Sequence, residues 1–114
     1  MSTQDIAGRL IHLCRNGEFI QAEEELYWQN AIQIEATGEK FEGIENLILK
    51  EKQFLDKLTE KPVVNVSDAI IASDFFAIKM HMEYVHKETG SGIIDEILVY
   101  KVNNGKIVLL VCYF

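Results

Sequence analysis

Glu96 is the residue of this sequence whose surroundings best suit acid–base chemistry. The segment 95–102 alternates as a β-strand does, so that Glu96, Leu98 and Tyr100 point to one face. Burial among apolar side chains raises the pKa of a carboxyl group, and a raised pKa suits proton transfer near neutral pH. We therefore predict Glu96 as a general acid or base, with Tyr100 or Tyr84 as a hydrogen-bond donor and Lys50 tuning the local charge. The alternative is that a tyrosine hydroxyl or Lys50 satisfies Glu96, which then only stabilises the core.

The other reactive side chains do not form a recognisable metal or nucleophile site. His81 and Glu83 share a strand face, but a third ligand at suitable spacing is absent. Cys14 and Cys112 lie far apart, without a CxxC pair, and are interpreted as small buried apolar residues. The three scattered histidines cannot be assigned to a catalytic triad. We expect no metal and no other cofactor.

A C-terminal half with the pattern of long β-strands must position these side chains. The candidate strands are 63–73, 75–87, 92–102 and 106–114, separated by turn-like residues. In the segment 75–87, apolar and polar side chains alternate. The apolar row consists of Phe76, Ile78, Met80, Met82 and Tyr84. This apolar row is expected to face the helices.

The register between these strands decides what shares the inner face. We assume that Tyr84 lies opposite Glu96, and that a three-residue loop at 103–105 joins the last two strands. Residues Val108, Leu110, Cys112 and Phe114 would then join the inner face. The outer face would carry Ile97, Val99, Ile107, Leu109, Val111 and Tyr113, which is too much exposed apolar surface for a monomer. We predict a homodimer in which these outer sheet faces pack together.

The N-terminal half has helical periodicity. Apolar stripes predict helices that start near Asp5, at about 18–27 and at about 42–58, with a short strand at 31–35. In the second helix, Glu23, Glu24 and Glu25 are expected on the outer face. Helices followed by a strand meander predict an α+β fold, with three N-terminal helices packed on the concave face of a strongly bent antiparallel sheet.

Composition limits the possible classes of function. The chain has 114 residues and a formal net charge of −7, which fits a single domain over 1–114 and argues against binding to nucleic acid. No apolar run is long enough to cross a bilayer, and no signal peptide is recognisable. The cysteine usage argues for a reducing compartment, so that we expect a cytoplasmic protein without a membrane partner.

An apolar pocket is expected inside the bend of the sheet. Aromatic and methionine side chains adapt well to small ligands, and several of them could line it: Tyr27, Trp28, Phe54, Met80, Met82 and Tyr100. For any single member an ordinary core position is the safer interpretation, whereas the cluster as a whole favours a pocket. Tyr84 and Cys112 belong to the same inner face and complete the predicted lining.

Three sequence stretches resemble the SnoaL-like domains of the nuclear transport factor 2-like superfamily. They are Asp74-Phe75-Phe76-Ala77-Ile78-Lys79, Asp95-Glu96-Ile97-Leu98-Val99-Tyr100-Lys101-Val102 and Asn104-Gly105-Lys106-Ile107-Val108. The resemblance implies a cone-shaped α+β fold. It also implies Glu35, Lys50, Glu83 and Glu96 as pocket residues, although the strand alternation points Glu83 outward. Relatives often carry a glutamate in the last strand, which this chain lacks.

The superfamily contains both enzymes and proteins without catalytic activity. The resemblance therefore implies two functions. The first is the binding of a small apolar molecule in the cone pocket. The second is a cofactor-independent isomerase, cyclase or hydrolase that uses a pocket carboxylate as general acid or base.

Overall fold

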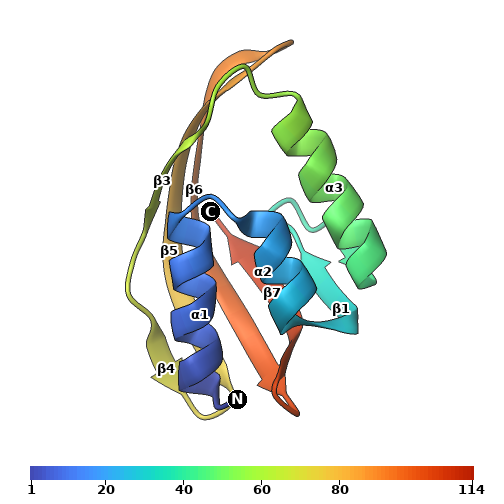
Figure 1. Ribbon diagram of the computed structural model, residues 1–114, viewed down its shortest axis with the longest axis vertical. Coiled ribbons are helices and arrows are strands. Elements are labelled where there is room, and N and C mark those ends of the chain that lie inside the picture. The colour runs from blue at the N-terminus through green and yellow to red at the C-terminus, as the bar shows by residue number, and fades with distance from the viewer.

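Three helices lie against one face of a seven-stranded sheet in the computed structural model, which describes residues 1–114 (Figure 1). The helices are α1 (Thr3–Arg15), α2 (Phe19–Leu26) and α3 (Ile44–Asp56). The strands are β1 (Tyr27–Ile34), β2 (Lys40–Glu42), β3 (Val63–Val66), β4 (Ile70–Ala72), β5 (Phe75–His86), β6 (Gly90–Asn103) and β7 (Lys106–Tyr113). The predicted α+β cone is confirmed.

The strands run in the order β2-β1-β7-β6-β5-β3, with β4 also paired to β5. All pairs are antiparallel except β1 with β7, so the sheet is mixed and not wholly antiparallel as predicted. Strand β1 follows α2 directly and begins at Tyr27, earlier than expected. It lies beside the last strand, β7, and runs in the same direction (Figure 1).

The register between β5 and β6 differs from the assumed one by four residues. Met80 pairs with Glu96, and Tyr84 pairs with Gly92. The strands extend to a three-residue loop between His86 and Gly90, which is tighter than expected. Gly92 accommodates this pairing because a Cβ there would lie 2.4 Å from the ring of Tyr84. Since the shift is even, every side chain keeps its predicted face.

A bulge in β7 changes the predicted faces at the start of this strand, because Lys101 pairs with Leu109 and Val102 with Ile107, so that Val108 has no partner in β6. The hairpin loop is the two-residue Asn104-Gly105, with both residues at positive φ as a type I′ turn requires. Before the bulge, Ile107 is fully buried, so its predicted outer position is wrong. Val108, predicted to be inside, is only half-buried. Leu110 and Cys112 regain the inner face as predicted.

The core lies between the helices and the concave face of the sheet. Its most buried large side chains come from all three helices and from β5 and β7; they are Ile6, Leu10, Leu13, Leu26, Leu47, Phe76 and Ile107. Helix α1 is oriented by a capping box in which the Ser2 side chain accepts from the Asp5 N–H. No helix is long and apolar enough to span a membrane.

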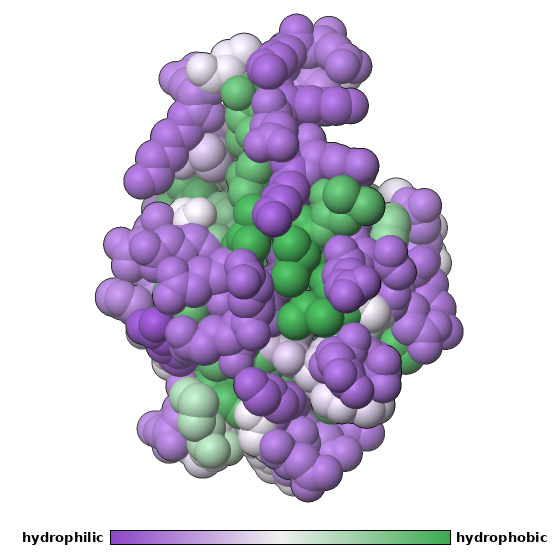
Figure 2. All heavy atoms as spheres, turned by 45° about the vertical axis from the view of Figure 1, so that its right-hand side comes forward, coloured by the Kyte–Doolittle hydropathy of each residue, from purple (hydrophilic) through white to green (hydrophobic).

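Apolar side chains also reach the surface. On the outer face of the sheet, Ile97 is 45% exposed and Tyr113 is 53% exposed, while Val99, Leu109 and Val111 are half-buried. A different face, turned toward the viewer in Figure 2, shows apolar side chains gathered in a central band between hydrophilic margins.

Candidate functional site

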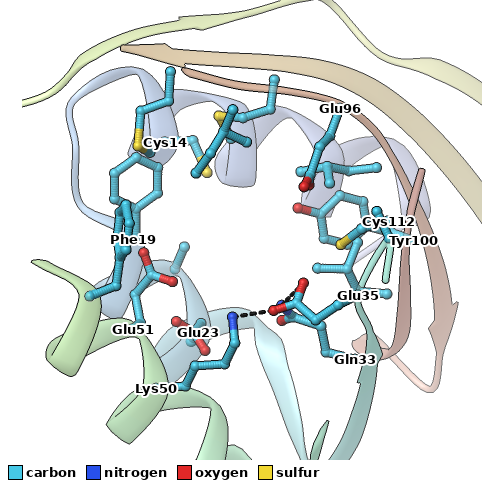
Figure 3. Close-up of a pocket in the computed structure, with 18 of the residues that line it drawn as sticks. Cys14, Phe19, Glu23, Gln33, Glu35, Lys50, Glu51, Glu96, Tyr100 and Cys112 are labelled. Atoms are coloured by element: carbon cyan, nitrogen blue, oxygen red, sulfur yellow. Dashed lines mark hydrogen bonds and ion pairs between the residues drawn. The ribbon is translucent and has the colours of Figure 1, made fainter. Parts of the chain in front are cut away.

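A cavity of about 490 Å³ opens between the three helices and the concave face of the sheet (Figure 3). Every helix and the strands β1, β5, β6 and β7 contribute side chains to it. Its apolar lining consists mainly of Leu10, Phe19, Tyr27, Phe54, Met80, Met82, Ile94, Leu98, Tyr100, Leu110 and Phe114. This volume is in the range of pockets that bind small molecules.

An ion pair between Lys50 and Glu35 lies at the cavity wall (Figure 3). Lys50 comes from α3, and Glu35 follows the end of β1, where the Gln33 amide donates to it at 3.4 Å. The Lys50 ammonium also lies 5.1 Å from the ring centre of Phe41. Burial by itself would lower the Lys50 pKa, but the hydrogen bond and charge of Glu35 outweigh it and the pKa is raised. Lys50 is therefore a cation whose charge is already matched.

Glu96 reaches the cavity from β6 and is half-buried there. Burial raises its pKa, the negative charge of Glu35 raises it further, and Lys50 opposes both. No hydrogen bond or ion pair engages its carboxyl group within the protein. Glu96 can therefore exchange a proton with a molecule in the cavity.

Tyr100 lies deeper in the same wall and is stacked on Phe76, with ring centres 4.6 Å apart and planes at 9°. Its hydroxyl group interacts with that of Tyr27, and each affects the pKa of the other. Burial is the main cause that raises the pKa of both tyrosines well above the usual range, so both hydroxyls keep their protons. This pair can supply a hydrogen bond but not a phenolate.

Two carboxyl groups on the helical side of the cavity were not predicted, the buried Glu23 and the half-buried Glu51. Glu23 of α2 is 7% exposed, although it was expected on the outer face. Burial and the neighbouring Glu51 raise its pKa to about 8, against an opposing effect of Lys50. Glu51 of α3 lines the same cavity, and burial raises its pKa as well. The signal was available, because both glutamates occupy apolar-stripe positions of their helices.

Most of the predicted pocket residues come together at this cavity. They are Glu35, Lys50, Phe54, Met80, Met82, Glu96, Tyr100 and Cys112. Three predicted residues lie outside it and are corrections. Trp28 is 45% exposed on β1, on the strand side opposite its buried neighbour Tyr27. Glu83 and Tyr84 line a separate hollow of about 370 Å³ near the β5–β6 hairpin, where Tyr84 contacts Phe54 edge-to-face.

The two cysteines are free, buried thiols that also line the cavity. Burial raises the pKa of each to about 12; nearby glutamates add to this effect. At neutral pH neither thiol supplies a thiolate nucleophile. No group of three or more His, Cys, Asp or Glu side chains is placed to hold a metal ion.

The model of the SnoaL-like domain family matches residues 1–114. No curated protein matches the chain. Among solved structures, a candidate SnoaL-like polyketide cyclase from Mesorhizobium loti, also labelled a carbohydrate phosphatase, has 24% identity and a TM-score of 0.89, with 100% of both chains covered. A candidate SnoaL-like polyketide cyclase from Jannaschia has 13% identity and a TM-score of 0.78, covering 98% of this chain and 85% of the other. A nuclear transport factor 2-like protein of unknown function from Burkholderia xenovorans has 18% identity and a TM-score of 0.76, covering 98% and 81%.

Proposed function

We propose that this chain, which belongs to the family of SnoaL-like domains, binds a small and largely apolar molecule in the cavity. The observation that carries the proposal is the cavity itself, with its mainly apolar lining and a few convergent polar groups. This combination is typical of sites that bury most of a ligand and orient it through a small number of hydrogen bonds.

The distribution of polar groups in the cavity indicates what kind of ligand would fit it. The sheet wall offers mainly apolar contact from Met80, Met82 and Leu98, which are themselves buried. Its polar group is Glu96, which pairs with Met80, and the Lys50–Glu35 pair lies elsewhere in the lining. A ligand with an apolar body and at least one polar group matches this distribution.

Catalysis by a pocket carboxylate is the second candidate function. It is favoured by Glu96, whose raised pKa and lack of a protein partner suit a general acid or base. Tyr100, whose hydroxyl keeps its proton, would supply hydrogen bonding to the reacting group. The polyketide cyclase descriptions of two structural neighbours fit such proton-transfer chemistry. An isomerase, cyclase or hydrolase without a cofactor is the corresponding enzyme.

Ligand capture tests the first proposal. Native mass spectrometry of the purified protein is expected to show a co-purified molecule, and the neutral fluorophore N-phenyl-1-naphthylamine is expected to bind. A Leu98→Trp variant, which fills the cavity, should abolish binding, whereas Ile93→Trp on the exposed strand surface should not. Equal binding to the two variants would contradict the proposal.

The Glu96→Gln variant distinguishes ligand binding alone from catalysis. If the protein is an enzyme, this variant retains the captured molecule but no longer converts it. The matched control is Glu83→Gln, which removes an exposed carboxylate from the neighbouring strand outside the cavity. Unchanged turnover in Glu96→Gln would eliminate Glu96 as the acid or base.

We also propose that two copies pair through the outer sheet face. Ile97 and Tyr113 are about half exposed there and form a continuous apolar row with Val99 and Val111. Their burial in a dimer would remove this surface from water. Ile97→Lys is expected to convert a dimer into a monomer in sedimentation velocity, whereas a wild-type monomer would refute the proposal.

A further inference from the structure

We infer that the molecule bound in the cavity carries a basic amino group, and that Glu23 and Glu51 seat this group as an ammonium ion. The inference rests on the proposed function, since it names the chemical class of the ligand that the cavity binds. It assigns a role to two carboxyl groups that the Glu96 chemistry does not use.

The first argument is the state of Glu23. Glu23 is only 7% exposed. Its carboxyl group takes part in none of the hydrogen bonds or ion pairs within the protein. Its carboxyl oxygens are not completely enclosed, because Glu23 lines the cavity. An ionisable group that is removed from bulk water and left without a protein partner is costly, and a ligand cation would offset that cost.

The second argument is the charge balance of the lining. Five glutamates line the cavity: Glu23, Glu35, Glu39, Glu51 and Glu96. Lys50 is the only basic residue there, and its ammonium pairs with Glu35. A cationic ligand would reduce this surplus of acid groups, whereas an anionic ligand would add to it.

The third argument is the aromatic surface beside the two carboxyl groups. Figure 3 shows Phe19, Glu23 and Glu51 on the helical side of the cavity. Phe54 and Tyr27 line the same cavity from α3 and β1. Aromatic faces attract ammonium groups, and the attraction increases when the site is shielded from water. Carboxyl groups next to aromatic rings therefore favour an amine over a neutral hydroxyl.

Binding of an ammonium ion must be coupled to a proton. Glu23 faces Glu51 and Lys50 on α3, Cys14 on α1 and Tyr27 on β1, with Glu24 next to it on α2. Its pKa of about 8 means that the carboxyl group is mostly protonated at pH 7 when the cavity is empty. An ammonium ion favours the carboxylate and displaces that proton. Amine affinity is therefore expected to rise by up to about tenfold per pH unit below pH 8, and to level off above it.

The experiment compares octylamine, 1-octanol and octanoate, which share an apolar chain and differ in charge. Each is titrated against the full chain loaded with N-phenyl-1-naphthylamine, and displacement of the fluorophore is measured at pH 7. Octylamine, which is protonated at this pH, is expected to bind at least about tenfold more tightly than 1-octanol, as a charge-assisted contact allows. Octanoate is expected to bind most weakly.

Two variants locate the effect. Glu23→Gln is expected to weaken octylamine binding by about tenfold and to leave 1-octanol within about twofold. The matched control Glu24→Gln removes the same charge from the exposed side of α2 and should leave both unchanged. Calorimetry in two buffers of different ionisation enthalpy should show release of about one proton per octylamine at pH 6.5, and none in Glu23→Gln.

The outcomes separate the two levels of proposal. If the fluorophore does not bind, the proposed function fails. If it binds but 1-octanol or octanoate displaces it as well as octylamine does, only the amine inference is overturned. Loss of octylamine binding in Glu24→Gln to the same extent as in Glu23→Gln would also overturn it, because the effect would then be a general one of net charge.

Discussion

Replacement of Glu23 by glutamine should stabilise the empty protein, and increasingly so as the pH rises. Glu23 is nearly enclosed, and its pKa of about 8 in the folded chain compares with 4.5 for a glutamate free of such surroundings. The main cause is burial, followed by the negative charge of Glu51. Glutamine has nearly the same shape and cannot ionise, so it removes this effect without leaving a cavity.

The sign and size follow from proton linkage. Below pH 4.5 the carboxyl group is protonated in both states, and the variant gains nothing. Between pH 4.5 and about pH 8 only the unfolded chain ionises, so the wild-type free energy of unfolding falls by about 1.4 kcal/mol per pH unit relative to the variant. At pH 7 the variant should be more stable by about 3 kcal/mol. Above pH 8 the difference should level off.

Urea unfolding followed by circular dichroism at pH 4.5, 6, 7 and 8 measures this difference. The control is Glu24→Gln, which lies next to Glu23 on the exposed side of the same helix. Its stability relative to the wild type should stay nearly constant over this range. If the difference between Glu23→Gln and the wild type did not change with pH, Glu23 would titrate normally in the folded protein and the argument for a buried carboxyl group would fail.

Two further predictions test the sheet. Gly92→Ala is expected to destabilise the protein by about 1–3 kcal/mol, because its Cβ would meet the ring of Tyr84; in a Tyr84→Ala background the cost should largely disappear when both are measured by urea unfolding. Ile107→Ala is expected to cost about 2–5 kcal/mol, and Val108→Ala clearly less, since only Ile107 is fully buried. Equal costs for these two would contradict the bulge in β7.

The faces of the long strands could be predicted because alternation is a local property. Met80, Met82, Leu98 and Tyr100 are all buried as predicted, although the assumed register between their strands was wrong. Alternation has a period of two, and the register differed by an even number of residues, so no side chain changed face. The register itself depends on where the loop between β5 and β6 begins and ends. Turn-like residues extend beyond this loop, so the sequence did not define its ends.

Local patterns could not predict features that depend on distant strands. The bulge that buries Ile107 compensates for a two-residue hairpin loop, and its position is fixed by pairing with β6. The parallel pairing of β1 with β7 joins segments from opposite ends of the chain. It also starts β1 at Tyr27, which places Trp28 on the exposed side. Neither the parallel pairing of β1 nor the exposure of Trp28 can be recognised from the residues near Trp28.

The helical glutamates are a different case, because their burial was encoded locally. In α2 the buried residues Phe19, Ala22, Glu23 and Leu26 follow the spacing of one helical face. In α3, Glu51 stands four residues after the buried Leu47, at the same stripe spacing. A surface helix has no reason to place a carboxyl group in its apolar stripe, since full burial would leave that group unpaired. An acid at a stripe position therefore indicates that the helix faces a cavity rather than a solid core, and here it points to the cavity before any strand is placed.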